Sequence, residues 1–339
     1  MDAGYRERTE RVEFEVLSSR AQPVSRSRGR AVAEPEDDIR TAYQRDRDRI
    51  VHSKAFRRLA HKTQVFLAPE GDHYRVRLTH TLEVTQVART IARALRLNED
   101  LVEAICLGHD LGHTPFGHQG EHIVAQFHPG FRHNLQSVRI VEVLERLNLT
   151  WEVRDGIANH TWSMQMPDSL EGQIARYADR IAYINHDIDD AIRAGILAEN
   201  ELPDEAFDVL GDSHSRRIHR MVADLIDASA EGDAISMSTE VFDAMGVTRD
   251  FLFEHVYLGR GGPPTQEAVE LIVLKLLEYF EKNGAPNDEG FAPFEMEIPG
   301  DVDERVRAVD YVAGMTDRFA LRAYESVVGE LPPGVGVLE

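Results

Sequence analysis

The 339-residue sequence contains a single cysteine, Cys106, which stands in an apolar run beside Ile105 and Leu107. One thiol cannot form an intrachain disulfide, so we expect Cys106 to be a buried structural residue. No stretch approaches the roughly 18–20 consecutive apolar residues of a membrane span, and the N-terminal residues lack the apolar segment of a secretory signal. These absences predict a cytoplasmic protein without a membrane partner.

Positive charge is also scarce, because 38 Lys and Arg residues face 59 Asp and Glu residues and give a formal net charge of -21. A surface of this sign repels nucleic acid, so an anionic ligand must bind in a locally basic pocket. Residues 40–77 are the exception, with ten basic and four acidic side chains. Few aromatic residues are interleaved there, so nucleic acid is not expected as the main ligand. The alternative to a basic binding region is a charged helix whose side chains are simply solvated.

Apolar residues recur at three- and four-residue steps through most of the chain from Ile39 onward, which predicts an all-α fold. Residues 64–67 and 74–77 flank the turn-forming residues 69–72 and predict a short β-hairpin. We expect an N-terminal arm without regular structure over residues 1–38, a helical core over 39–200 and a C-terminal helical lobe over 201–339 that packs on the core.

Histidine is concentrated in residues 107–122, which read LGHDLGHTPFGHQGEH. Upstream, a helix predicted from Thr79 to about Leu97 has His80 on its buried face. Asn98 is expected to cap the next helix, on which His109 lies. Imidazole titrates near neutrality and binds divalent metals, so clusters of histidine beside carboxylates indicate metal or acid–base chemistry.

The best candidates for metal ligands are His80, His109, Asp110 and Asp179, because each lies at a buried helical face or a helix end. Two imidazoles and two carboxylates suit Mn, Mg, Fe, Co, Ni or Zn better than a thiolate-seeking ion. The dipeptide His-Asp is weak evidence alone, since it recurs at 186–187 and a buried histidine is more often a hydrogen-bonded core residue.

The order of these four residues resembles the HD phosphohydrolase superfamily, and longer strings narrow the resemblance. They are RDRDRIVHSKAFRRLAHKTQVF (45–66), RVRLTHTLEV (75–84), GHDLGHTPFGHQGE (108–121), FRHNLQSVRIV (131–141), ADRIAYINHDIDDA (178–191) and YVAGMTDRFAL (311–321). They are similar to the bacterial deoxyguanosinetriphosphate triphosphohydrolase-like family. The resemblance covers residues 25–195 and the C-terminal helix, whereas residues 200–300 carry no assigned motif.

The resemblance implies an all-helical HD-domain hydrolase in which those four residues hold one divalent metal per subunit, with Mn or Mg expected first. The implied reaction cleaves a deoxynucleoside 5′-triphosphate (dNTP) at the α-phosphorus and releases the deoxynucleoside and triphosphate. By motif position, His118 and Glu121 are the catalytic pair: Glu121 orients the imidazole, and His118 supplies or relays a proton at the cleaved bond. A role for His118 as a helix cap is the alternative.

Substrate residues follow from the same motifs in the related eukaryotic dNTP triphosphohydrolase with SAM and HD domains. This comparison assigns phosphate contacts to Arg77, His113, His133 and Arg180. An ordinary surface charge is the alternative for each of them.

The sugar contacts follow from the same relative, and they are assigned to Tyr183, Asp187 and Gln64. The carboxylate would accept a hydrogen bond from the 3′-hydroxyl, and the aromatic ring would fill the 2′ space and reject ribonucleotides.

Arg57, Arg58 and Lys62 are assigned to the triphosphate or to a regulatory nucleotide site where subunits meet, and both assignments stay open. The resemblance implies a homo-oligomer and an activating dNTP at a subunit interface. Two other functions also stay open: an HD phosphohydrolase of nucleoside monophosphates or phosphodiesters, and a catalytically silent dNTP-sensing protein.

Overall fold

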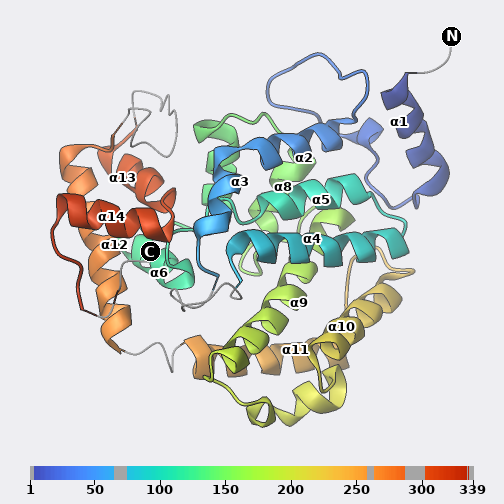
Figure 1. Cartoon of the computed structure of the whole chain (residues 1–339). Helices are drawn as coiled ribbons and strands as arrows, with labels where there is room; N and C mark the ends of the chain where they lie inside the picture. Colours follow the sequence, from blue (N-terminus) through green and yellow to red (C-terminus); the bar gives the residue numbers. More distant parts are fainter. Residues whose placement is uncertain (1–3, 65–74, 258–262, 287–301, 334, 336–339) are drawn as a thin grey trace. The chain divides into compact units, whose positions relative to one another are not determined.

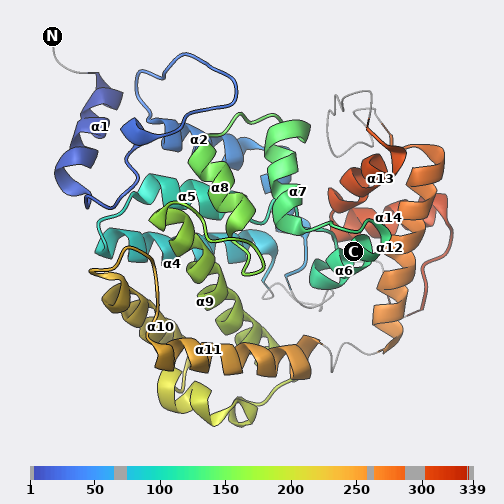
Figure 2. The same cartoon turned by 180° about the vertical axis from the view of Figure 1, so that it is seen from behind.

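The computed structural model describes residues 4–64, 75–257, 263–286, 302–333 and 335 (Figures 1 and 2). Over these residues the fold is all-α, as predicted. The chain forms two compact units, which we call unit 1 (residues 1–51, 80–109 and 148–260) and unit 2 (52–79, 110–147 and 261–339). They are not the consecutive segments 39–200 and 201–339 that we expected, because neighbouring stretches of the chain contribute to different cores.

Unit 1 contains the longer helices of the N-terminal half and the middle of the chain. They are α1 (Tyr5–Val16), α2 (Ala42–His52), most of α4 (Arg77–Ala94), α5 (Glu99–Gly108), α8 (Trp151–Asn159), α9 (Leu170–Arg193), α10 (His214–Ser229) and α11 (Thr239–Leu252). Short helical turns span Val24–Arg26, Glu199–Glu201, Ala206–Leu210 and Phe253–Tyr257.

Helix α9 is the centre of unit 1, and α5, α8, α10 and α11 all pack against it. Its apolar stripe runs through Ile174, Ile181 and Ile188, all buried. Helices α5 and α8 approach closely at Gly156, where an added Cβ would lie 2.6 Å from the Cδ1 atom of Ile105. A side chain at position 156 would therefore separate the two helices.

The expectation of an irregular N-terminal segment is wrong for Tyr5–Val16, which forms α1. The helix was hidden from periodicity because its buried side chain is Glu13, while Val12 and Phe14 are exposed. The carboxylate of Glu13 accepts hydrogen bonds from the Val24 amide (2.8 Å) and the Asn98 side-chain amide (3.1 Å). Helix α1 is thus joined to unit 1 by polar contacts rather than by an apolar stripe.

Asn98 caps α5 as predicted, since its side-chain oxygen accepts from the amides of Asp100 and Leu101. Helix α4 begins at Arg77, two residues before the predicted start at Thr79, which we expected to be its cap. The Thr79 hydroxyl instead donates to the carbonyl oxygen of Val76 over 2.8 Å.

Unit 2 contains α3 (Lys54–Arg58), a turn at Leu59–His61, α6 (Gly117–Phe127), α7 (His133–Arg139), a π-helical turn at Ile140–Leu144, α12 (Pro263–Asn283), α13 (Glu304–Ala313) and α14 (Asp317–Val327). Helix α12 packs against α6, α13 and α14. Their common core includes Val124, Ile272, Leu276, Tyr311 and Leu321, all buried.

Residues 65–74, which make up most of the predicted hairpin, lie outside the described residues. The flanking residues Thr63 and Val76 form one antiparallel bridge. The described residues contain no longer strand pairing. No described helix is both long and apolar enough to cross a membrane.

Candidate functional site

In unit 1, two of the predicted metal-binding histidines face one carboxylate. His80 lies in the first turn of α4, His109 directly follows α5, and Asp179 lies on α9. The distance from His80 Nε2 to Asp179 Oδ1 is 3.2 Å, and the distance from His109 Nε2 to the same oxygen is 3.7 Å. Both imidazoles are buried. The structure therefore brings together three of the predicted metal ligands, which come from three separate helices or helix ends.

The other ring nitrogens of these histidines have fixed partners. His109 Nδ1 lies 2.6 Å from the carbonyl oxygen of Cys106, which can only accept, so this nitrogen carries the proton and Nε2 keeps its lone pair. His80 Nδ1 faces Nδ1 of His186 at 3.3 Å. Lone-pair nitrogens around a carboxylate oxygen form a donor set that fits a divalent transition metal or Mg²⁺.

The negative charge of Asp179 also suits the binding of a divalent metal ion. Burial by itself would raise the pKa of this carboxyl group, but the neighbouring imidazoles of His109 and His80 hold the pKa well below its ordinary value. Asp179 is therefore ionised at neutral pH.

The predicted substrate residues of α9 line the helix after Asp179. Arg180 is only 9% exposed, and its guanidinium lies 3.9 Å from the ring centroid of Trp162. Among the described residues no carboxylate forms an ion pair with it, and burial lowers its pKa. Tyr183 and Asp187 follow at one-turn steps, and burial raises the pKa of Tyr183. Trp162 was missed by the sequence analysis because it lies in the loop before α9, outside the quoted motifs.

In unit 2, Asp110 is held by an arginine. Arg77 Nη1 donates to Asp110 Oδ2 over 2.8 Å, and both side chains are buried. Arg77 was predicted to contact phosphate, and Asp110 was predicted to bind metal. The structure adds that the arginine orients the carboxylate.

The predicted catalytic pair and two phosphate-binding histidines gather around Glu121 in unit 2. Glu121 Oε1 lies 2.8 Å from His133 Nδ1, and Glu121 Oε2 lies 3.8 Å from His118 Nδ1. The rings of His113 and His133 stack with their centroids 4.1 Å apart. Glu121 therefore binds His133 more closely than His118, a partner that the sequence analysis did not assign to it.

The charges in this cluster follow from these contacts. Burial opposes ionisation of Glu121, but the positive charge of His133, the hydrogen bond from His133 and the nearby His118 ring lower the pKa of Glu121. Burial lowers the pKa of His133, yet Glu121 reverses that effect and raises it. Burial, Arg77 and His133 together hold the pKa of His113 well below its usual range. The result is an ionised Glu121–His133 pair beside a neutral His113.

His118 differs from these neighbours because its side chain is 60% exposed. His118 is the second residue of α6. The residue that precedes this helix, Phe116, has a left-handed backbone conformation (φ 62°). An exposed imidazole next to a partly buried carboxylate can exchange protons with solvent and with a bound ligand.

The remaining predicted residues of unit 2 make mainly internal contacts. The Lys62 ammonium is buried and donates to the carbonyl oxygens of His113 and Ala313, and burial lowers its pKa. Arg58 lies 3.7 Å from Glu145. Arg57 Nη2 donates to the carbonyl oxygen of His52 over 3.2 Å.

Gln64 is buried in unit 2, and its carbonyl oxygen lies 3.5 Å from Arg77 Nη2. The phosphate, sugar and regulatory roles assigned to these residues stay predictions.

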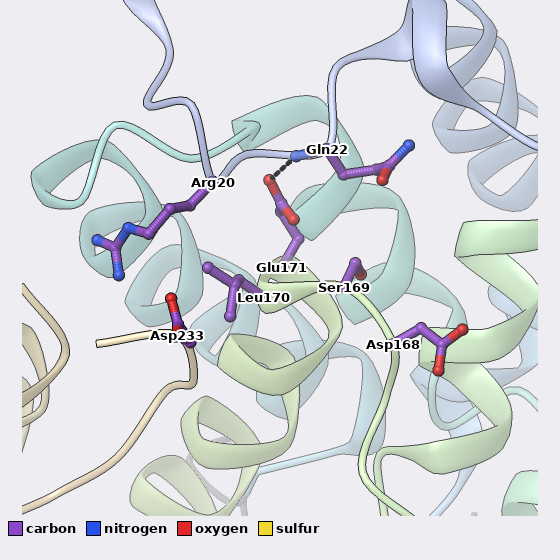
Figure 3. A pocket seen from close by; sticks show the side chains of 7 residues that line it. All are labelled: Arg20, Gln22, Asp168, Ser169, Leu170, Glu171 and Asp233. Atoms are coloured by element: carbon purple, nitrogen blue, oxygen red, sulfur yellow. Dashed lines mark hydrogen bonds between the residues drawn. The ribbon is translucent and has the colours of Figure 1, made fainter. Parts of the chain in front are cut away.

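Unit 1 has a cavity of about 290 Å³, and none of the predicted site residues lines it. Figure 3 shows its lining side chains. Arg20 lines it and donates to the carbonyl oxygens of Ser229 (3.0 Å) and Ala230 (2.8 Å). Glu171 Oε1 accepts from the amide of Gln22 over 3.0 Å. Arg20 and Glu171 therefore make internal contacts of unit 1. The lining residues are Arg20, Gln22, Asp168, Ser169, Leu170, Glu171 and Asp233.

Two segments of this chain match models of known protein families. Residues 77–184 match the HD domain, and residues 235–326 match the phosphohydrolase-associated domain. The first region contains all four predicted metal ligands. The second covers much of residues 200–300, where the sequence analysis found no motif.

Similar proteins extend over almost the whole chain. A deoxyguanosinetriphosphate triphosphohydrolase-like protein of Caldanaerobacter subterraneus subsp. tengcongensis is 55% identical over 328 residues, covering 95% of both chains. One from Desulfatibacillum aliphaticivorans is 47% identical over 352 residues, covering 96% of this chain and 99% of its own. A phosphohydrolase structure from Bacteroides thetaiotaomicron has a similar fold, with a TM-score of 0.50 and 18% identity over 81% of this chain and 67% of that chain.

Proposed function

Because this chain belongs to the deoxyguanosinetriphosphate triphosphohydrolase-like family, and is therefore a hydrolase, we propose that it cleaves dNTPs at the α-phosphorus. The products are a deoxynucleoside and intact triphosphate. The observation that carries this proposal is the pair of buried imidazoles whose Nε2 atoms face one ionised carboxylate, Asp179, in a chain with this family's motifs.

We propose that His80, His109, Asp110 and Asp179 hold one divalent ion, Mn²⁺ or Mg²⁺ first. The fit rests on the chemistry of the donors, since His109 keeps a lone pair on Nε2 and Asp179 keeps its negative charge. A bound ion would lower the pKa of a water molecule and neutralise phosphate charge. Arg77 holds the Asp110 carboxylate in one orientation before any ligand arrives.

His118 is the proposed proton donor to the oxygen that leaves with the deoxynucleoside. Its exposed imidazole can reach a bound ligand, and its Nδ1 lies 3.8 Å from Glu121 Oε2. The ionised Glu121–His133 pair keeps the Glu121 carboxylate in place. His113 and His133 then present stacked imidazoles for the phosphate contacts that the family motifs assign to them.

On α9, Arg180 is proposed to bind the triphosphate, because a buried guanidinium without a carboxylate partner among the described residues gains most from an anionic ligand. Tyr183 and Asp187, with Gln64, are proposed to recognise the deoxyribose. Arg57 and Arg58 are retained as candidates for a regulatory dNTP site in a homo-oligomer. Lys62 is a weaker candidate, since carbonyl oxygens already surround its ammonium.

The test is product analysis of the purified chain incubated with each dNTP, alone and in mixtures, with Mn²⁺ or Mg²⁺. We expect deoxynucleoside and triphosphate in equal amounts, and we expect Asp110→Ala to abolish their release. Removal of single phosphates in steps, or an Asp110→Ala variant with full activity, would contradict the proposal.

A further inference from the structure

The second His-Asp dipeptide of the chain, at residues 186–187, contacts the predicted metal ligand His80 through His186. We propose that His186, supported by Glu83, positions the imidazole of His80 for metal binding. This inference rests on the proposed metal site, of which His80 is a ligand. His186 and Glu83 are then positioning residues, because they act through His80 rather than on the substrate.

The three side chains form a chain of contacts within unit 1. His80 Nδ1 lies 3.3 Å from His186 Nδ1, and His186 Nε2 lies 3.1 Å from Glu83 Oε2. The rings of His80 and His186 meet edge to face, with centroids 5.5 Å apart and an interplanar angle of 87°. Both imidazoles are buried, whereas the Glu83 side chain is 41% exposed. The opposite nitrogen of His80, Nε2, faces Asp179.

These contacts define one arrangement of protons that suits a metal ligand. When His80 offers the lone pair of Nε2 to a metal ion, its proton must be on Nδ1. That proton then needs an acceptor, and His186 Nδ1 accepts it when the His186 proton is on Nε2. The Nε2–H group of His186 in turn donates to the Glu83 carboxylate, which can only accept. Each hydrogen bond thus fixes the direction of the next.

The two metal-binding histidines are therefore oriented by different means. The Nδ1 atom of His109 donates to the backbone carbonyl of Cys106, so no substitution of a side chain can remove that acceptor. His80 depends on a side-chain acceptor from α9, which is in turn held by Glu83 one turn after His80 on α4. Groups that hold metal ligands in this way typically contribute 10–100-fold to metal affinity.

The experiment is calorimetric titration of the metal-free chain with Mn²⁺ in the absence of nucleotide. His186→Leu removes the acceptor and is expected to weaken Mn²⁺ binding by about 10–100-fold. His186→Asn can place its side-chain oxygen near the position of Nδ1 and should retain most of the affinity. Glu83→Gln keeps the shape of Glu83 but loses its charge, so we expect an intermediate loss.

Gln86→Ala is the matched control, because Gln86 is exposed on α4 one turn beyond Glu83 and its amide bonds only to Thr90 among the described residues. The thermal unfolding midpoint of each metal-free variant shows whether a loss of affinity comes from misfolding. If His186→Leu is misfolded, the comparison of Glu83→Gln with Gln86→Ala decides.

If folded His186→Leu and Glu83→Gln both bind Mn²⁺ as tightly as the wild type, this inference is overturned and the proposed hydrolase stays intact. A wild-type chain that binds neither Mn²⁺ nor Mg²⁺ would overturn the proposed metal site, and the positioning role of His186 with it.

Discussion

Replacement of Gly112 by alanine tests how the loop after His109 and Asp110 is held in unit 2. An alanine Cβ at this position would lie 2.2 Å from the Ser137 amide nitrogen and 2.3 Å from the His133 carbonyl oxygen. Both are backbone atoms of α7, which cannot turn aside as a flexible side chain can. The Gly112 amide also donates to Ser137 Oγ over 2.8 Å, so the loop and the helix are in direct contact.

The expected cost follows from these distances. Ordinary contacts to a Cβ begin near 3.4 Å, so α7 must move away by more than 1 Å. Overpacking of this kind costs about 1–3 kcal/mol, and loss of the hydrogen bond to Ser137 adds about 1 kcal/mol. We therefore expect Gly112→Ala to lower the free energy of unfolding by about 2–4 kcal/mol. Activity should fall as well, because His133 at the start of α7 stacks on His113.

Urea unfolding followed by circular dichroism measures this change. Gly246→Ala is the control, since Gly246 lies inside α11 and an added Cβ would meet nothing within 4 Å. That substitution should stabilise the chain by about 0.5–1 kcal/mol, the usual gain of alanine over glycine in a helix. A Gly112→Ala variant within about 0.5 kcal/mol of the wild type would refute the reasoning about α7.

Three further substitutions test other contacts. Trp162→Leu removes the aromatic ring that the Arg180 guanidinium stacks on. In steady-state kinetics we expect KM for dNTP to rise about tenfold while kcat changes little. A fall in kcat alone would argue against a binding role. Burial raises the pKa of Glu13 from 4.5 to about 7. The folded chain therefore binds this proton more tightly, and stability should fall as pH rises from 4.5 through 7, by on the order of 1 kcal/mol after solvent screening. Glu13→Gln should remove that slope from urea unfolding measured across this range, and an unchanged slope would contradict the assignment. Asp310→Ala removes the carboxylate that two nitrogens of Arg139 contact at 2.7 Å. We expect the free energy of unfolding in urea to fall by about 3 kcal/mol. A fall of less than about 1 kcal/mol would show that water replaces the carboxylate.

The parts of the fold that were predictable are those in which local pattern and final packing agree. Helix α9 was visible because its apolar residues recur at helical spacing and are buried in unit 1. Helix α5 was visible because Asn98 caps it through local hydrogen bonds. Helix α1 was not visible, since Glu13 rather than an apolar stripe faces unit 1. The division into two units was also hidden, because periodicity reports which face of a helix is buried but not which helices share a core.

The contacts of Glu121 show the same limit within the candidate site. His118 and Glu121 are three residues apart, so their proximity on one helix could be inferred from spacing alone. The closer contact is with His133, which the chain reaches only after α6 has ended and the loop has turned back to begin α7. Because a buried ion pair loses far more when one partner is removed than an exposed pair does, the nonlocal partner has the larger influence on the charge of Glu121. A substitution at His133 should therefore disturb Glu121 more than the same substitution at His118, even though motif position pairs Glu121 with His118.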